Sequence, residues 1–350
     1  MADWMIYGAN GYSGALIARE AHRRGLTPVL AGRSASVKTL AGELGLRSRI
    51  FAMDHPGLAQ ELAGMKVVLH CAGPFSATAR PMMEACLGAG AHYLDITGEI
   101  SVFETGASLD SEAEAAGIVI MPGVGFDVVP TDCVAATLKA ALPTATSLAL
   151  GFDSRSGFSP GTAKTSVEGL GQGGRVRRDG AIQPVPLAWK TRHIDFGDGE
   201  KLAMTIPWGD VSTAWHSTGI PNVETYIPAS PKLVARLKRL NWVRPLLGLS
   251  PVQSFMKSRI AKSVRGPSAE TRDKTPTFVW GEVTNQRGER RVARLSTPNG
   301  YTLTVTASLG IVEHLLKHDV EGGYRTPSRL MGADYVTTLP GCSAITVSKS

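Results

Sequence analysis

The stretch DWMIYGANGYSG, residues 3–14, decides the fold. An apolar run is followed at once by three glycines spaced three residues apart, Gly8, Gly11 and Gly14. At a turn from a strand into a helix, the first glycine permits the tight turn, the second admits a diphosphate close to the backbone, and the third lets the helix pack closely on the strand. The N–H groups at the start of the helix attract the anion. The stretch therefore predicts a dinucleotide-binding turn, which also contains Asn10 and Tyr12.

Outward from this stretch, the first third of the chain alternates between short β-type runs and helical runs. Strands that alternate with helices of this size indicate βαβ units and a parallel sheet. The class expected is therefore α/β, with a Rossmann doubly wound parallel sheet. We expect its strands at residues 3–9, 27–33, 49–53, 66–72, 92–97 and 117–123.

After residue 123 the pattern changes. The spacing of the later strand-like runs predicts an α+β domain with an antiparallel sheet, and with basic helices packed on one face. The segment 123–136 is expected to be a turn that leads into a helix beginning near Pro130 or Thr131. The strand-like runs lie at residues 146–152, 224–228, 278–283, 291–296 and 301–308.

The end of the second strand predicts which cofactor is bound. Enzymes that use NAD place an acidic residue there to hold the ribose 2′-hydroxyl. Here the strand ends in Arg33 and Ser34, without a carboxylate. A guanidinium and a hydroxyl suit a 2′-phosphate, so the expected cofactor is NADP(H). Asp54, after the third strand, is a candidate for the adenine edge.

The end of the fourth strand is expected to line the nicotinamide side of the cofactor. The expected nicotinamide residues are Cys71, Ala72, Gly73, Pro74 and Phe75.

A short-chain dehydrogenase is disfavoured, because none of the seven tyrosines is followed four residues later by the lysine that such enzymes need.

Three side chains are candidates for moving the proton that accompanies hydride transfer. Asp95 ends the fifth strand, Asp127 lies in the turn after the sixth strand, and His216 lies in a tryptophan-rich segment. The alternatives are structural. Thr97 and Glu99 would cap the next helix, Thr131 or Asp132 would cap the helix that follows, and the histidine would be a packed, hydrogen-bonded residue. A proton taken from water would need no side chain at all.

The positive charge of the chain is concentrated in one segment. The chain has 37 basic and 30 acidic residues, a formal charge of +7, yet no acidic residue lies between Glu224 and Glu270. Basic residues alternate there with leucines, which predicts amphipathic helices with a cationic face. That face is either simply solvated or a landing surface for an acyl carrier or a membrane; nucleic acid is disfavoured, since no recognition motif accompanies the charge. The basic residues are Lys232, Arg236, Lys238, Arg239, Arg244, Lys257, Arg259, Lys262 and Arg265.

Composition excludes several other classes of protein. The four cysteines form no CxxC pair, so we expect neither a metal site nor a disulfide framework. No apolar run reaches the about 18 residues that a membrane span needs. The N-terminus has no pattern of a secretory signal. The expected location is the cytoplasm, with a peripheral membrane contact as the alternative.

Several segments together resemble the saccharopine dehydrogenase-like family: YGANGYSG (7–14), LAGRS (30–34), CAGPF (71–75), HYLDITGE (92–99) and MPGVGFDVVPTD (121–132). Two later segments, 208–227 and 322–332, look like its trans-acting enoyl reductase branch. The resemblance covers the whole chain. It implies NADPH-dependent reduction and a Rossmann domain (1–128), an α+β substrate domain (129–310) and a C-terminal segment (311–350) that returns to the Rossmann domain.

The function that the resemblance implies is reduction of an activated C=C bond on a large apolar substrate derived from a polyketide or a lipid. Two alternatives stay open. One is an NADPH-dependent imine reductase of the saccharopine type, and the other is a non-catalytic NADP-binding protein docked to a membrane or a carrier. The expected partners are an apolar small molecule or a carrier-bound acyl substrate. A membrane or acyl carrier would be contacted through 232–265, and a homodimer is one expected assembly.

Overall fold

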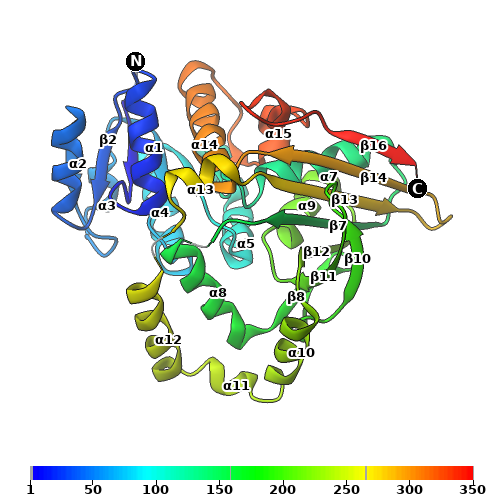
Figure 1. Ribbon diagram of the computed structural model, residues 1–350. Coiled ribbons are helices and arrows are strands. Elements are labelled where there is room, and N and C mark those ends of the chain that lie inside the picture. The colour runs from blue at the N-terminus through cyan, green and yellow to red at the C-terminus, as the bar shows by residue number, and fades with distance from the viewer. Residues whose placement is uncertain (1–2, 158, 265, 350) are drawn as a thin grey trace. The chain divides into compact units, whose positions relative to one another are not determined.

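The computed structural model describes residues 3–157, 159–264 and 266–349 (Figure 1). Contacts divide the chain into two compact units. The first unit comprises residues 1–127 and 301–330, and the second comprises residues 128–300 and 331–350.

The first unit is built on a seven-stranded parallel sheet, in the order β15-β6-β5-β4-β1-β2-β3. Neighbouring strands pair in parallel, and the order turns back at β1 and β4, as in a doubly wound sheet. The predicted Rossmann sheet is thereby confirmed. Its strands are β1 (Asp3–Tyr7), β2 (Val29–Gly32), β3 (Ser48–Ile50), β4 (Met65–His70), β5 (His92–Asp95), β6 (Val119–Met121) and β15 (Gly323–Tyr324).

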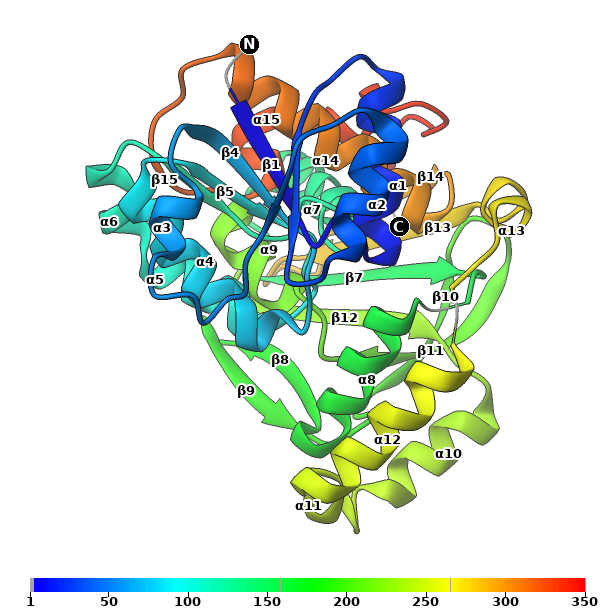
Figure 2. The same ribbon diagram turned by 90° about the vertical axis from the view of Figure 1, so that its left-hand side faces the viewer.

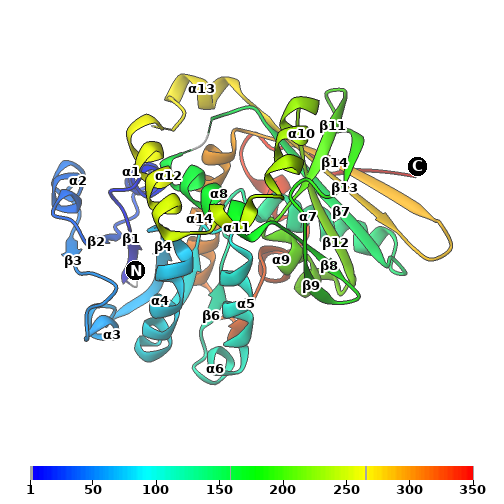
Figure 3. The same ribbon diagram turned by 90° about the horizontal axis from the view of Figure 1, so that it is seen from below.

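Helices cover this sheet, and buried side chains from the helices and strands fill the space between them. Tyr7, Val68, Met82 and Tyr93 belong to one buried cluster. Figure 3 shows α4 and α5 next to each other, and they pack together. The helices of this unit are α1 (Tyr12–Arg23), α2 (Ser36–Leu44), α3 (Leu58–Glu61), α4 (Phe75–Ala89), α5 (Ile100–Ser108), α6 (Asp110–Ala115), α14 (Gly300–Lys317) and α15 (Pro327–Met331).

The strand predicted at 301–308 is wrong, because these residues open the long helix α14. Three threonines, a valine and a tyrosine favoured a strand locally. Leu303, Ala307 and Ile311 are nevertheless buried at helical spacing, so packing of that helical face overrides the local preference.

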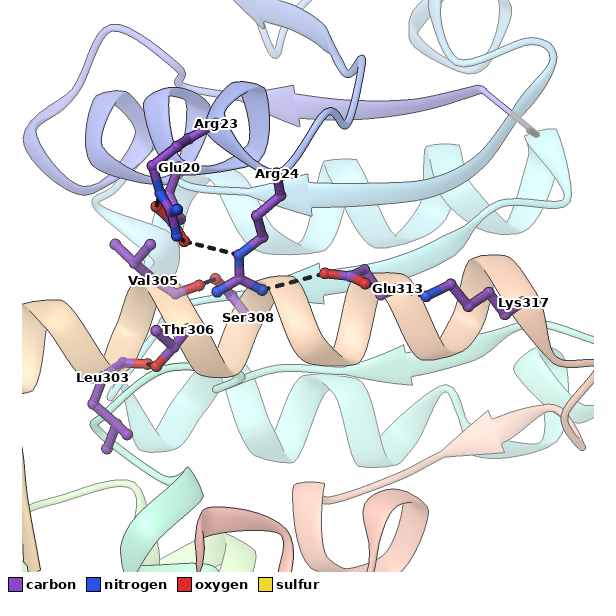
Figure 4. A network of polar contacts seen from close by, with 9 residues as sticks. All are labelled: Glu20, Arg23, Arg24, Leu303, Val305, Thr306, Ser308, Glu313 and Lys317. Carbon is purple, nitrogen blue, oxygen red and sulfur yellow. Dashed lines mark hydrogen bonds and ion pairs between the residues drawn. The ribbon is translucent and has the colours of Figure 1, made fainter. Parts of the chain in front are cut away.

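Helix α14 lies along α1, as Figure 4 shows. Arg24, after α1, bonds to Glu20 at 2.8 Å and to Glu313 of α14 at 3.2 Å. The hydroxyls of Thr306 and Ser308 donate to carbonyls three residues earlier, at 3.2 and 3.3 Å, so α14 keeps these polar side chains hydrogen-bonded (Figure 4).

The second unit is built on a nine-stranded mixed sheet. Its main path is β10-β11-β12-β7-β13-β14-β16, and β8 pairs with both β12 and β9. The expected antiparallel sheet needs one correction, because β12 pairs with β7 in parallel. The strands are β7 (Ser147–Ser154), β8 (Gly174–Arg178), β9 (Ala181–Val185), β10 (Thr191–Asp195), β11 (Glu200–Ile206), β12 (Asn222–Pro228), β13 (Thr277–Thr284), β14 (Arg290–Thr297) and β16 (Thr346–Lys349).

Helix α7 packs directly on this sheet. A Cβ atom at Gly281 of β13 would lie 2.6 Å from Val134 Cγ1 of α7, so only glycine admits the helix this closely. Among the basic helices, α10 packs on β11, whereas α11 and α12 pack on α8. The helices are α7 (Val129–Ala141), α8 (Pro160–Gln172), α9 (Asp210–Thr218), α10 (Pro231–Leu240), α11 (Arg244–Leu247), α12 (Ser250–Ser263), α13 (Ala269–Lys274) and the 3₁₀ helix η1 (Tyr335–Thr338).

The C-terminal part of the chain divides differently from the expected 311–350 segment. All of residues 301–330 belong to the first unit, where β15 pairs with β6. The last twenty residues, 331–350, belong to the second unit, because β16 pairs with β14. Of the predicted basic residues, Arg265 lies outside the described residues, as do the side chains of Lys257 and Lys262.

Candidate functional site

The turn between β1 and α1 has the close backbone packing that its glycines predict. Gly8 has φ of +83°, and its N–H donates to Ala31 O of β2 at 2.7 Å. A Cβ atom at Gly14 would lie 2.2 Å from Gly8 O, so a side chain there would collide with the backbone of the turn. Two of the three glycines are therefore required by the fold itself.

The third glycine leaves the start of α1 open. Gly11 is the N-cap residue, and it makes no side-chain cap to the helix. Its own Cβ would lie 3.2 Å from Gly8 O, a contact that a small shift relieves. Gly11 and Asn10 are exposed here, next to the positive end of the helix. This end of α1 fits the diphosphate of a dinucleotide.

Polar side chains gather at the end of β2. Asn10 Nδ2 donates to Ser36 Oγ at 2.9 Å, and Ser34 Oγ lies 3.0 Å from the same hydroxyl. Arg33 is exposed beside them. Sequence reasoning missed Ser36, although its place two residues after Ser34 could have pointed to it. A cation and three neutral polar groups suit a phosphate better than a ribose hydroxyl.

Arg33 and Asp54 both lie near the Tyr7 hydroxyl. Burial raises the pKa of Tyr7, the charge of Arg33 opposes that rise, and the charge of Asp54 adds to it. Both side chains are exposed. The ends of β2 and β3 thus meet at one edge of the sheet, as the predicted adenosine site requires.

The predicted nicotinamide turn, 71–75, lies against the glycine turn. Cys71 N donates to Tyr7 O at 2.7 Å, and a Cβ at Gly8 would lie 2.8 Å from Ala72 Cβ. Burial raises the pKa of the Cys71 thiol far above its ordinary value, so it stays protonated. Gly73 and Pro74 are exposed, and a ligand can reach them.

Glu99 holds this turn from the next loop. Its carboxylate accepts from Phe75 N at 3.1 Å and from Ser76 N at 2.8 Å, and so caps α4. Thr97 Oγ1 accepts from Glu99 N at 3.0 Å. Thr97 and Glu99 are thus a capping pair, as the structural alternative predicted, but the helix capped by the carboxylate is α4 and not α5.

His70, at the end of β4, is a residue that sequence reasoning missed. It is fully buried, and its Nε2 lies 2.9 Å from Thr78 Oγ1. That hydroxyl donates to Ala72 O at 2.8 Å or to Pro74 O at 3.1 Å, so the histidine must be the donor to it. Burial lowers the pKa of His70 to about 3. His70 therefore stays neutral and positions the nicotinamide turn.

Asp95 is completely buried, which changes the role expected for it. Its Oδ1 accepts from Thr97 N and Gly123 N, both at 2.9 Å, and its Oδ2 accepts from the Tyr93 hydroxyl at 2.7 Å. Burial raises its pKa to about 7 against these hydrogen bonds. With no exposed surface, the carboxylate is placed to hold the loops after β5 and β6, and not to touch a ligand as predicted.

Asp127 has a different environment. It is partly exposed and lies in the loop after β6, in the same unit as the glycine turn. Its Oδ2 would lie 3.0 Å from a Cβ at Gly98, so the carboxyl packs against the loop after β5. Burial raises its pKa to about 7. Among the predicted acids, Asp127 is partly accessible to solvent and also has a pKa suited to a general acid at neutral pH.

His216 lies in α9 of the second unit, where it is partly buried. The helices α7 and α9 are joined by polar contacts, in which Thr131 Oγ1 donates to Asp210 Oδ1 at 2.5 Å and Ser217 Oγ donates to Asp132. Thr131 and Asp132 therefore bond across to α9, beyond the capping expected for them.

The comparisons with known proteins agree with this geometry. Residues 4–121 match the family model of the saccharopine dehydrogenase NADP binding domain. The predicted resemblance and the NADP(H) cofactor are thereby confirmed. Among the described residues, no group of three or more His, Cys, Asp or Glu side chains could hold a metal ion, and no helix is long and apolar enough to cross a membrane.

Two curated relatives match part of the chain. A trans-acting enoyl reductase of Mycobacterium leprae is 34% identical over 140 residues, which cover 37% of this chain and 34% of that protein. A human saccharopine dehydrogenase-like oxidoreductase is 29% identical over 217 residues, which cover 52% of this chain and 50% of that protein. The chain thus spans between a third and half of the length of these relatives.

A solved structure shares the whole fold. The apo saccharopine dehydrogenase (L-Glu forming) of Saccharomyces cerevisiae matches over 100% of both chains, with a TM-score of 0.66 and 11% identity. At this identity the likeness concerns the fold alone.

Proposed function

We propose, from the premise that residues 4–121 form an NADP-binding domain of the saccharopine dehydrogenase type, that the protein is an NADPH-dependent enoyl reductase. Its substrate would be an activated C=C bond in a large apolar acyl chain of lipid or polyketide origin. The observation that carries the proposal is the 34% identity to a trans-acting enoyl reductase over 140 residues. No acidic residue stands at the end of β2, which supports NADPH as the hydride donor.

The residues of the first unit would hold the cofactor along the edge where the strands end. The start of α1, at Gly11, would take the diphosphate. Arg33 and Ser34 would bind the 2′-phosphate, and Asp54 would meet the adenine. The nicotinamide would lie by the 71–75 turn, which Glu99 and His70 keep in place. When bound, NADPH supplies the hydride.

Asp127 would supply the proton. Reduction of the C=C bond adds a hydride to one carbon and a proton to the other, and leaves NADP⁺. Because burial raises the pKa of Asp127 to about 7, a large fraction of this carboxyl is protonated at neutral pH. Partial exposure lets it regain a proton from water after each turnover. His216 stays the alternative donor that the sequence offers.

We expect Asp127→Asn to lower kcat about 100-fold, the ordinary size of a general-acid contribution. The wild-type kcat should fall as the pH rises through about 7, since only the protonated carboxyl can donate. In the variant this descending limb should disappear. NADPH binding, measured by fluorescence, should stay as in the wild type. An unchanged rate and pH profile would mean that water donates the proton.

We expect Arg33→Ala to weaken NADPH binding by about 1.5–3 kcal/mol and NADH binding very little, because the guanidinium would contact only the 2′-phosphate. Calorimetry with both cofactors measures the ratio. Arg47→Ala is the matched control, since Arg47 is an exposed arginine directly before β3 and so lies at the start of the parallel strands, whereas Arg33 lies at their ends. An NADPH/NADH ratio equal to that of the wild type would refute the assignment.

The two other readings of the sequence can be separated from this one by experiment. An imine reductase is favoured by the likeness to saccharopine dehydrogenase-like oxidoreductases, one of which matches 52% of the chain. Oxidation of NADPH with enoyl thioesters or unsaturated lipids would support the proposed function. Oxidation only with keto acids plus amines would support the imine reductase. NADPH binding without oxidation by any of them would indicate a non-catalytic binding protein.

The partners belong to the same proposal. The substrate would reach the enzyme on an acyl carrier or in a membrane, with the contact made through 232–265. A homodimer is the proposed assembly, which sedimentation analysis would test.

A further inference from the structure

The exposed apolar side chains of the protein are concentrated in one segment of the second unit. Of the eight large hydrophobic side chains that are exposed among the described residues, six lie between residues 233 and 255. Trp242 is the extreme case, since 90% of its surface is exposed. A folded protein ordinarily buries a tryptophan, so this exposure calls for a partner. The six are Leu233, Trp242, Val243, Leu246, Leu249 and Phe255.

These side chains lie on α10, α11, α12 and the turns between them, and we call residues 231–263 the basic tip. Figures 1 and 2 show these helices together with α8 at one end of the second unit, away from β14 and β16. The exposed residues are thus gathered at an extremity of this unit, where a flat surface could approach them.

Helix α10 carries its charged and its buried apolar side chains on opposite faces. Val234 and Leu237 pack inward on β11. Lys232, Arg236 and Arg239 follow at spacings of four and three, so they share the opposite face of the helix. All three are exposed. The outer face of α10 is therefore a stripe of cations.

Both ends of the exposed turn are fixed to the body of the unit. Asn241 Oδ1 accepts from Leu187 N at 2.8 Å, and its Nδ2 donates to Leu187 O at 3.2 Å. Gln253 Nε2 donates to Val167 O of α8 at 3.0 Å. Trp242 thus projects from an anchored turn, and little conformational entropy would be lost on docking.

The described cations of the basic tip lack acidic partners within the chain. Within the part of the chain that the structure describes, none of its exposed cations forms an ion pair with an acidic side chain. No Asp or Glu lies between Glu224 and Glu270 to provide one. The cations concerned are Lys232, Arg236, Lys238, Arg239 and Arg259.

We propose that the basic tip docks on an anionic lipid bilayer, with Trp242, Leu246 and Phe255 inserted among the acyl chains and the cations at the headgroups. Helices that lie in a membrane interface combine Lys and Arg with Trp, Phe and Leu in this way. A protein partner would need pockets for side chains spread over three helices, whereas a bilayer accepts them without a matching shape. The proposal rests on the proposed function in one respect only, which is that docking would give the enzyme access to an apolar substrate.

The test measures binding of the full chain to vesicles by sedimentation, without cofactor or substrate. We expect binding to phosphatidylcholine mixed with phosphatidylglycerol, and little binding to phosphatidylcholine alone. Raising the salt should weaken binding, because the Debye length falls from about 10 Å at 0.1 M to about 3 Å at 1 M. Reversing Arg236, Lys238 and Arg239 to Glu should lower the affinity by at least about 100-fold, because loss of the three cations alone costs about 3 kcal/mol and the three new anions add repulsion.

Insertion is tested by the fluorescence of Trp242. Brominated lipids should quench it, and the quenching should be lost in Trp242→Ala, because the other tryptophans are buried or partly buried. Ile50→Ala is the matched control, since Ile50 is an exposed apolar residue of the first unit and should leave binding unchanged.

Absence of vesicle binding by the wild type would overturn the proposal, and so would equal binding to both kinds of vesicle. If vesicles do not bind but an acyl carrier protein is captured, and the charge reversal abolishes that capture, the carrier and not a membrane is the partner. NADPH binding and oxidation are measured separately without lipid. Absence of vesicle binding therefore does not contradict the proposed reductase activity, and absence of NADPH oxidation does not contradict membrane docking.

Discussion

Asp95→Ala is expected to destabilise the protein by about 3–9 kcal/mol. Removal of the carboxylate leaves three buried donors without their acceptor, namely Thr97 N, Gly123 N and the Tyr93 hydroxyl. Each buried donor that is left unpaired costs about 1–3 kcal/mol. Chemical denaturation followed by circular dichroism measures the loss, which should appear also in the absence of NADPH.

Asp95→Asn is the control for this prediction. The amide keeps an oxygen for the two backbone N–H groups and offers its NH₂ to the Tyr93 hydroxyl, so the cost should be about 1 kcal/mol. Because burial raises the pKa of Asp95 to about 7, folding favours its protonated form. The carboxyl's contribution to stability is then present at pH 4 and is lost as the pH rises through about 7. The wild type should therefore lose stability relative to Asp95→Asn over this interval.

A stability difference between wild type and Asp95→Asn that does not change with pH would contradict the buried, protonated state. Equal stability of Asp95→Ala and Asp95→Asn would contradict the three-donor geometry. Both results would return Asp95 to the list of candidate proton donors.

Gly11→Val is expected to abolish measurable NADPH binding in a protein that still folds. The branched side chain would occupy the space at the start of α1 where the diphosphate approaches the backbone. The fold should tolerate the change, because Gly11 has φ of −73° and its Cβ would meet only Gly8 O, at 3.2 Å. Calorimetry with NADPH and thermal unfolding give the two readouts.

Gly42→Val is the matched control for this variant. Gly42 lies in α2, and a Cβ there would meet nothing within 4 Å, so NADPH binding should be unchanged. Gly14→Ala gives the opposite outcome, because its Cβ would lie 2.2 Å from Gly8 O and should damage the fold itself. Native affinity for NADPH in folded Gly11→Val would show that the diphosphate binds elsewhere.

The sequence by itself determined the dinucleotide-binding half of this protein. The glycine spacing, the alternation of strands and helices, and the acid-free end of β2 are local patterns, since each depends on residues close together in the chain. The strand expected at residues 3–9 is β1, Asp3–Tyr7, because its apolar run ends directly at the glycine turn. The local patterns also placed Arg33, Ser34 and the 71–75 turn at the ends of strands that the sheet brings together.

Tertiary structure alone decided the features that depend on distant residues. The run at 301–308 has strand-like composition, yet it is helical because α14 buries one face in the first unit and is tied to Arg24. The parallel pairing of β7 with β12 joins strands some 75 residues apart, such as Ser147 and Asn222, and no local pattern encodes such a pairing.

The same reason explains the site residues whose roles changed. Asp95 looks like an available acid in the sequence, but Gly123 N, 28 residues later, reaches it only after β5 and β6 are paired. Glu99 caps a helix that begins 24 residues earlier in the chain. Burial and hydrogen-bond partners are set by the packed fold, so the chemistry of a carboxylate is decided there, whereas the sequence fixes only where in the fold it stands.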